Sequence, residues 1–131
     1  MPNENKQEAP GDVIIKVFGI KNCDSCRKAL KWLETEGISH RFHDVREHPP
    51  SADLIKLWCE SAHGHKLLNR RSTTWRSLNG RQRAAALNNP APALSEHPTL
   101  IKRPVFMRGR EVLAVGFRAQ DQQELLLRRG A

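Results

Sequence analysis

Several residue types and patterns are scarce in this 131-residue sequence, and each shortage narrows what the protein can be. There is no tyrosine, and aromatic residues make up only 5% of the chain, so a surface for stacking nucleic-acid bases is poorly supplied. No uncharged apolar run approaches the roughly 20 residues of a membrane-spanning helix. Residues 1–12 lack the apolar stretch of a secretory signal. We therefore expect a cytoplasmic protein with no membrane partner.

Cysteine and acidic residues are also few. The three cysteines, in a reducing cytoplasm, indicate catalysis or metal binding rather than a framework of disulfides. Lys and Arg number 22 against 14 Asp and Glu, and the resulting net charge of +8 predicts anionic partners. Charge alone does not distinguish nucleic acid, an anionic small molecule and simple solubility. The length is that of one domain, since such domains commonly have about 100–150 residues.

The hydrophobic pattern predicts the element order β-α-β, a helical stretch, then β-β-α. Residues 1–12 are polar, and we expect them to form a disordered N-terminal tail. Four segments have the β-branched or alternating character of strands: 13–18, 38–45, 105–107 and 112–115. Five segments fit helices: 23–37, 51–63, 84–87, 92–96 and 121–129. Gly37 fits a helix end, and the turn containing Gly109 fits a β-hairpin.

This order of elements predicts an α/β fold. A β-α-β opening implies a parallel strand pair with a right-handed crossover, and the closing hairpin and helix complete a small mixed β-sheet flanked by helices. The layout is typical of a thioredoxin-like fold with a helical insertion, at about residues 50–98, between the βαβ and ββα halves. We expect residues 13–131 to form a single domain.

The motif Cys23-Asp24-Ser25-Cys26 lies between a predicted strand and the first turn of a predicted helix. Free N–H groups and the helix dipole stabilise an anion there, so the pKa of Cys23 should fall below its ordinary value of about 8.5. Cys26 lies one turn on, along the same side. We therefore predict that Cys23 is a nucleophile and Cys26 a resolving thiol that attacks a mixed disulfide at Cys23.

Two other interpretations of the cysteines stay open. The pair could be inert buried thiols, or half of a zinc site. Zinc usually needs four ligands, and neither Cys59 nor the histidines supply a matching second pair, so we expect no metal. Cys59 follows Trp58 in a predicted helix, where a free cysteine usually fills the core.

Arginine and proline mark a second part of the candidate site. Pro104 stands just before a predicted strand, and in a thioredoxin-type site a cis proline faces the cysteines. Arg103 would then be carried to the site, where its guanidinium can hold an oxyanion or carboxylate. The run from Lys66 to Arg83 holds six basic residues and no acidic one. Its arginines, Arg71 among them, could close over the same site or form a solvated basic face.

Three segments resemble the arsenate reductase-related family of the ArsC and Spx type, nearest its YffB subgroup. They are Gly19-Ile20-Lys21-Asn22-Cys23-Asp24, Arg70-Arg71-Ser72-Thr73-Thr74-Trp75-Arg76 and Ile101-Lys102-Arg103-Pro104. The resemblance covers the chain from about residue 13 to the end. It implies a thioredoxin fold with an inserted helical subdomain, and a glutathione- or thiol-linked reductase.

The resemblance also implies residue roles. Cys23 matches the family's nucleophile, Arg103 the arginine before the cis proline, and Pro104 that proline, while Arg71 resembles an arginine of the insertion. We count Asn22, next to the nucleophile in the first segment, with Arg71, Arg103 and Pro104 as substrate-binding.

The cysteine motif itself is close to the redox switch of Spx, a transcriptional regulator that binds RNA polymerase. Three functions follow as hypotheses. The first is a thiol–disulfide oxidoreductase in which Cys23 attacks a small-molecule or protein disulfide, glutathione is the co-substrate, and Lys21, Arg71 and Arg103 hold anionic groups. The second is arsenate reduction, which needs at least two arginines converging on Cys23. The third is an Spx-like regulator with RNA polymerase as partner. No bound cofactor is expected.

Overall fold

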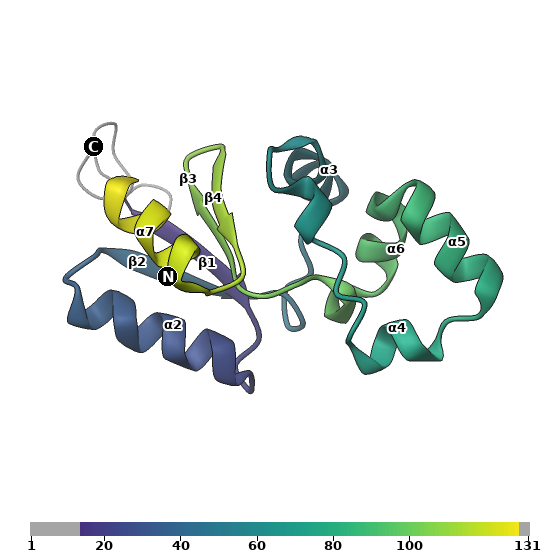
Figure 1. The fold of residues 1–131 in the computed structure, drawn as a ribbon, viewed down its shortest axis with the longest axis horizontal. Coiled ribbons are helices and arrows are strands. Elements are labelled where there is room, and N and C mark those ends of the chain that lie inside the picture. Colours follow the sequence, from purple (N-terminus) through teal and green to yellow (C-terminus); the bar gives the residue numbers. More distant parts are fainter. Residues whose placement is uncertain (1–13, 129–131) are drawn as a thin grey trace.

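The first strand, β1 (Ile15–Gly19), is an inner strand of a mixed four-stranded sheet with the order β2-β1-β3-β4 (Figure 1). The computed structural model describes residues 14–128, so the expectations for residues 1–13, including the tail at 1–12, and for 129–131 lie outside the described residues. β1 runs parallel to β2 (His40–Asp44) and antiparallel to β3 (Val105–Arg108). β4 (Glu111–Val115) completes the predicted hairpin at the sheet edge.

Helix α2 (Asp24–Thr35) forms the crossover between the two parallel strands, as the sequence predicts. It begins immediately after Cys23 and ends before Gly37, whose φ of +68° lies in the left-handed region that favours glycine. Gly109 takes a φ of +59° in the β3–β4 turn, because a tight hairpin turn needs the same conformation. The mixed sheet, its flanking helices and the helical insertion confirm the predicted thioredoxin-like fold.

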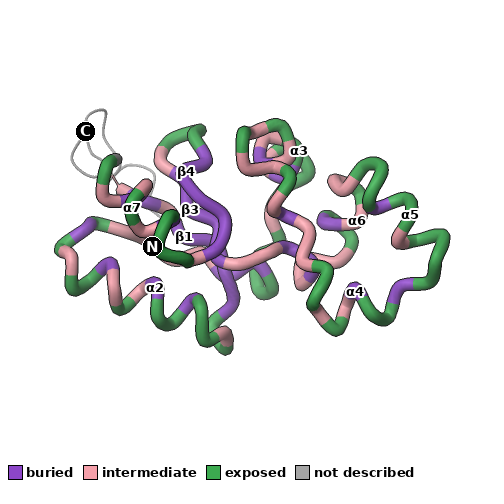
Figure 2. Tube along the Cα trace, viewed as in Figure 1, coloured by how far each residue is buried: buried purple, intermediate pink, exposed green. Residues whose placement is uncertain are grey.

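Alternation of side chains along the strands sends apolar residues to both faces of the sheet. On one face, Ile15 and Phe106 pack with Leu33 of α2 and Leu125 of α7 (Ala119–Arg128). On the other face, Phe18, Val105 and Met107 pack with residues of the insertion. The sheet therefore lies between two different helical layers, and its buried positions are concentrated in β1, β3 and β4 (Figure 2).

The insertion between β2 and β3 contains four helices: α3 (Ala52–Glu60), α4 (Thr73–Ser77), α5 (Gly80–Asn88) and α6 (Pro90–Glu96). A 3₁₀ turn, η1 (Gly64–Lys66), lies between α3 and α4, and a second, η2 (Pro98–Leu100), follows α6. The sequence pattern located three of the helices and missed α4, because five residues are too short to show a period. The sequence does contain a signal for the start of α4, because its N-cap residue is Ser72, whose hydroxyl accepts a hydrogen bond from the Trp75 backbone N–H at 3.0 Å.

Trp58 joins the insertion to the sheet. It is 0% exposed, and its indole N–H donates to the sulfur of Met107 in β3 at 3.0 Å. Its ring meets the edge of Phe18 in β1, with the ring centroids 5.0 Å apart. One side chain of α3 thus contacts both inner strands. Within residues 14–128, no helix is long and apolar enough to span a membrane.

We predict that Trp58→Ala lowers the free energy of unfolding by about 3–5 kcal/mol, because it leaves a large cavity between α3 and the sheet. Urea unfolding followed by circular dichroism measures this change. Leu87→Ala is the matched control, since Leu87 of the insertion is 52% exposed and its loss should change stability by less than about 0.5 kcal/mol. Equal effects of the two substitutions would contradict the anchoring role of Trp58.

Candidate functional site

Cys23 is the N-cap residue of α2, at the point where the chain leaves β1. Its backbone is extended, with φ −136° and ψ 121°, and its carbonyl accepts from the Arg27 N–H at 2.9 Å. Its side chain makes no capping bond, so the half-buried sulfur is available at the positive end of the helix dipole. The sequence predicted this placement.

The environment of Cys23 favours its thiolate. Burial by itself would raise the pKa of Cys23, but hydrogen bonds from the backbone and thiol of Cys26 and from the Arg103 guanidinium, together with the Arg103 charge, lower it below the ordinary value. Lowering the pKa increases the nucleophilic fraction of the thiol at neutral pH. The helix start, Cys26 and Arg103 therefore act on one sulfur atom.

Cys26 has the opposite character, although it lies only three residues away. Cys26 is 1% exposed, and its burial raises its pKa to about 12. The nearby Cys23 charge also raises this pKa, whereas a hydrogen bond from the Ile20 backbone lowers it. Its sulfur occupies the space beside Gly19 at the end of β1, where any Cβ atom would collide with it. The site thus pairs an accessible thiolate with a buried, protonated thiol.

The Arg103–Pro104 peptide bond is cis, as the thioredoxin-like layout predicts. Arg103 is held by its own segment, because its Nη1 donates to the carbonyls of Thr99 at 3.1 Å and Ile101 at 3.3 Å. Its Nε is buried and has no acceptor within residues 14–128. These bonds fix the guanidinium beside Cys23 rather than leaving it to move in solvent.

Arg71 reaches the same site through a backbone contact between distant segments. Leu68 and Ile101 form an isolated antiparallel bridge. On either side of it, the Asn69 N–H donates to Leu100 at 2.8 Å and the Lys102 N–H donates to Leu67 at 2.7 Å. The bridge therefore places the chain before Arg71 beside the chain before Arg103.

Two hollows with cationic linings meet at these arginines. The first, of about 540 Å³, is lined by Asn22, Cys23 and Arg46 together with both arginines and hydroxyl side chains of the insertion. The second, of about 420 Å³, is lined by Ser25, Lys102 and Arg118 together with the same arginines. Within residues 14–128, no carboxylate lines either hollow, so both are suited to anionic groups.

The structure thus brings together Cys23, Cys26, Asn22, Arg71, Arg103 and Pro104, the residues predicted from the sequence. For Lys21, which we expected to hold an anionic group, the structure corrects the prediction. Its Nζ pairs with Glu47 at 3.3 Å, and it lines neither hollow. The sequence could not show this ion pair, because Glu47 lies on the loop after β2, far from Lys21 in the sequence. Arg46 takes a place in the first hollow that sequence analysis missed.

Asp44 is a second residue that sequence analysis missed. It is 7% exposed at the end of β2, and its carboxylate accepts from the backbone N–H groups of Lys21 at 3.0 Å, Arg46 at 2.8 Å and Glu47 at 3.0 Å. Burial would raise the pKa of Asp44, but these hydrogen bonds lower it. Asp44 holds the loop that leads into Cys23. The sequence feature that could have indicated this role is the position of Asp44 at the end of a predicted strand, just before a turn.

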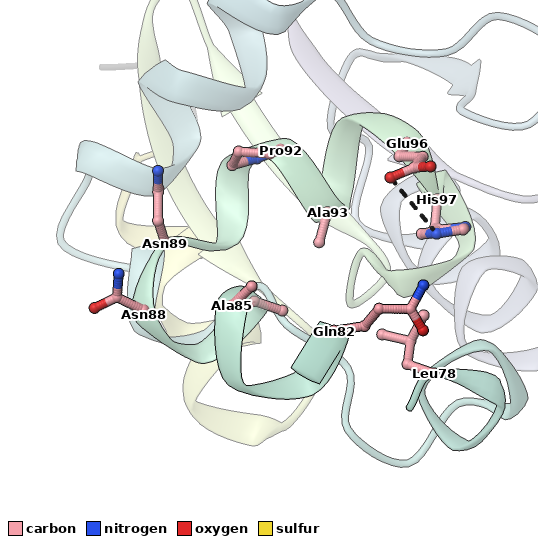
Figure 3. Close-up of a pocket in the computed structure, with 10 residues that line it drawn as sticks. Leu78, Gln82, Ala85, Asn88, Asn89, Pro92, Ala93, Glu96 and His97 are labelled. Atoms are coloured by element: carbon pink, nitrogen blue, oxygen red, sulfur yellow. Dashed lines mark ion pairs between the residues drawn. The ribbon is translucent and has the colours of Figure 1, made fainter. Parts of the chain in front are cut away.

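Other candidate groups lie apart from this site. Cys59 of α3 is half-buried against the core of the insertion, and burial and then Glu60 raise its pKa, which suits the predicted packing role. A hollow of about 360 Å³ between α5 and α6 shares no residue with the two cationic hollows (Figure 3). Glu96 and His97 face each other there at 3.9 Å, and no cysteine lines it. Within residues 14–128, no group of three or more His, Cys, Asp and Glu side chains is placed to hold a metal.

Comparison with known proteins gives a consistent set of relatives. A family model described as the ArsC family matches residues 18–125. A solved structure of a YffB protein is 31% identical, with a TM-score of 0.74, and covers 86% of this chain and 96% of that one. An arsenate reductase (ArsC) related protein from Brucella melitensis is 32% identical, with a TM-score of 0.68, and covers 92% and 99%. The global transcriptional regulator Spx of Lactiplantibacillus plantarum is 26% identical over 88% of this chain and 89% of that protein.

We predict that Arg103→Gln raises the pKa of Cys23, because it removes a hydrogen-bond donor and a positive charge from the sulfur. The rate of iodoacetamide alkylation at neutral pH should therefore fall, because a smaller fraction of the Cys23 thiol is ionised. Peptide mapping by mass spectrometry assigns the alkylation to Cys23. Arg103→Lys, which keeps the charge, should retain part of the rate. An unchanged midpoint of the pH–rate profile in Arg103→Gln would show that Arg103 does not stabilise the thiolate.

Asp44→Ala should lower the free energy of unfolding by about 2–3 kcal/mol, because it leaves three backbone N–H groups without their acceptor. The folded-state pKa of Asp44 is depressed, so its contribution is present above the unfolded value of about 3.9 and is lost as the pH falls through the folded value. Denaturation at pH 7 and at acid pH should therefore show a smaller difference between the variant and the unchanged protein in acid. A difference that does not depend on pH would exclude a role for the charge.

Proposed function

The chain belongs to the ArsC family, a family of thiol-based reductases, and on that premise we propose that it is a glutathione-dependent thiol–disulfide oxidoreductase with Cys23 as nucleophile. One observation carries the proposal. Cys23 stands at the start of α2 and lines a cationic hollow, and hydrogen-bond donors of Cys26 and Arg103 stabilise its thiolate. This arrangement favours a thiolate and leaves it accessible to a substrate.

The first step is an exchange of sulfur partners. The Cys23 thiolate attacks one sulfur of a disulfide R–S–S–R′, forming a Cys23–S–S–R bond as the S–S bond of the substrate breaks. The second sulfur leaves with the electron pair as a thiolate and takes a proton from water. The lowered pKa of Cys23 supports this role, because only the thiolate attacks.

Cys26 completes the exchange in the second step. Its proton is held while Cys23 is a thiolate, partly because the Cys23 charge raises the pKa of Cys26. Once Cys23 is in the mixed disulfide that charge is gone, so Cys26 loses its proton more readily. The Cys26 thiolate then attacks the Cys23 sulfur, forms a Cys23–Cys26 disulfide and releases R as a thiolate. Two glutathione molecules reduce this disulfide and leave as oxidised glutathione.

The arginines favour glutathione or another small anionic thiol as the reductant. Glutathione carries two carboxylates, and Arg71 and Arg103 present forked donors on the wall shared by the two hollows. Asn22 adds an amide beside the sulfur, and the segment ending at the cis Pro104 offers backbone groups to the substrate. No bound cofactor takes part in this scheme.

Arsenate reduction is a second candidate, which a specific observation favours. It requires at least two arginines near the nucleophile, and both Arg71 and Arg103 line the hollow that contains Cys23. In this reaction the thiolate would attack arsenic while the guanidinium groups stabilise the developing oxyanion charge. The similarity to Spx supports a third candidate, a redox-switched regulator with RNA polymerase as partner and without turnover.

The decisive experiment follows NADPH consumption coupled through glutathione reductase, with a mixed disulfide of glutathione and a small thiol offered separately from arsenate. We expect turnover on the mixed disulfide, and we expect Cys23→Ser to reduce it to the rate without protein. Cys26→Ser should still form the mixed disulfide with Cys23, seen as a mass increase, but should resolve it more slowly.

The outcomes separate the three candidates. Turnover that survives in Cys23→Ser would exclude the proposed nucleophile. Cys23-dependent turnover on arsenate alone would establish the second candidate. No turnover on either substrate would favour the third candidate, the redox-switched regulator. The next experiment would then look for a complex with RNA polymerase that depends on redox state.

A further inference from the structure

The charged residues of one segment of the insertion are all basic, and the proposed thiol chemistry does not require most of them. Residues 61–95 contain no Asp or Glu, although this segment forms one wall of the site. The segment contains six Lys and Arg residues, namely Lys66, Arg70, Arg71, Arg76, Arg81 and Arg83. A segment of this length without any acid is a strong local source of positive potential.

Four of these arginines form a continuous series that starts at the Cys23 hollow. Arg71 lines the hollow, and the Arg76 guanidinium donates to the Arg71 carbonyl at 3.0 Å. The Arg83 guanidinium in turn donates to the Arg76 carbonyl at 3.0 Å. Arg70 and Arg83 both lie over the Trp75 ring, 5.6 Å and 5.9 Å from its centre. We call Arg70, Arg71, Arg76 and Arg83 the arginine track.

The arginine track is ordered but not neutralised. Within residues 14–128, none of its guanidinium groups is ion-paired with a carboxylate. Bonds to backbone carbonyls hold Arg76 and Arg83 in place, so less side-chain entropy is lost when a partner binds. Four like charges held near one another are stabilised by an anionic partner more than by water alone.

The surroundings of the track favour a protein partner over a nucleic acid. Trp75, the only aromatic residue of the segment, is 8% exposed and has guanidinium groups over its ring, so it offers no open face on which a base could stack. The track also begins at a nucleophilic thiol. A partner that follows the track to its end brings its own groups to Cys23, and a protein can present a disulfide there, whereas a nucleic acid cannot.

We propose that the arginine track binds the acidic flank of a protein disulfide while Cys23 attacks its sulfur, so the oxidised substrate is an acidic protein or peptide. This inference rests on the proposed thiol–disulfide exchange and adds the class of its substrate. The step balances as above: a Cys23–S–S–protein bond forms, the substrate disulfide breaks, and the displaced thiolate takes a proton from water.

The test uses three synthetic peptides that differ only in charge. Each contains one cysteine, flanked by glutamates, glutamines or lysines, and joined through a disulfide to thiopyridine. Attack by Cys23 on the peptide sulfur releases the thiopyridine, whose absorbance gives the second-order rate. At low salt we expect the acidic peptide to react about tenfold faster than the neutral one and the basic peptide to react slowest. The differences should shrink as salt is raised, because the charges are exposed to solvent.

Matched variants assign the preference to the arginine track. Arg70→Gln, Arg76→Gln and Arg83→Gln combined should remove most of the advantage of the acidic peptide and leave the neutral rate unchanged, which also reports a folded protein. Lys31→Gln, Lys56→Gln and Arg110→Gln combined remove the same charge from exposed positions elsewhere and should preserve the advantage. Replacing the three track arginines with lysine should restore it, since lysine keeps the charge.

Each failure has a distinct meaning. Equal rates for the three peptides, with release still dependent on Cys23, would overturn the acidic substrate and leave the proposed function intact. No Cys23-dependent release from any peptide would overturn the proposed function, and the inference with it. Charge-independent peptide rates combined with tight binding of a single-stranded RNA oligonucleotide, lost in the track variant, would overturn the inference in favour of a nucleic-acid surface.

Discussion

The short antiparallel contact between residues 67–69 and 100–102 is the constraint on which the site depends. It joins the segment after η1 to the segment that enters β3, and residues 70–99, which contain α4, α5 and α6, lie between the two in the sequence. Without it, Arg71 and Arg103 would belong to separate surfaces. With it, one arginine from each segment meets at the wall that the two cationic hollows share. Trp58 supports the arrangement from the opposite end, since it fixes α3 against both inner strands of the sheet.

The two cysteines show how position on one helix separates two chemical roles. Cys23 precedes the first turn and receives hydrogen bonds from Cys26 and Arg103, whereas Cys26 lies within that turn and is covered by β1. The same helix start therefore lowers one pKa and leaves the other raised. Neither thiol requires a metal or a cofactor for this difference, because burial and hydrogen bonding account for it.

Local patterns predicted the parts of the site that are close together in the sequence. Cys23 and Cys26 follow a strand and open a helix, and Arg103 and Pro104 precede a strand, so element order was sufficient to bring them to one end of the sheet. The role of Asp44 and the pairing of Lys21 with Glu47 depend on a contact between the loops after β1 and β2, which no single segment encodes. Helix α4 was missed for a different reason: its five residues are too few to show a helical period, and its one local signal is the capping serine, Ser72. The meeting of Arg71 with Arg103 was anticipated, but the backbone bridge that causes it was not.

The close approach of Gly19 to the Cys26 sulfur has a consequence for how this site can evolve. Any side chain at position 19 would occupy the volume of that sulfur, and Phe42 closes the other side with a ring atom 3.3 Å from the Cβ position. The two positions are therefore coupled: a lineage that retains a resolving cysteine at position 26 must retain glycine at position 19. If a smaller residue replaces Cys26, the sulfur no longer fills this space and position 19 has more room for alanine. Recovery of the second thiol would require both changes to be reversed, so the loss of the cysteine pair becomes difficult to undo.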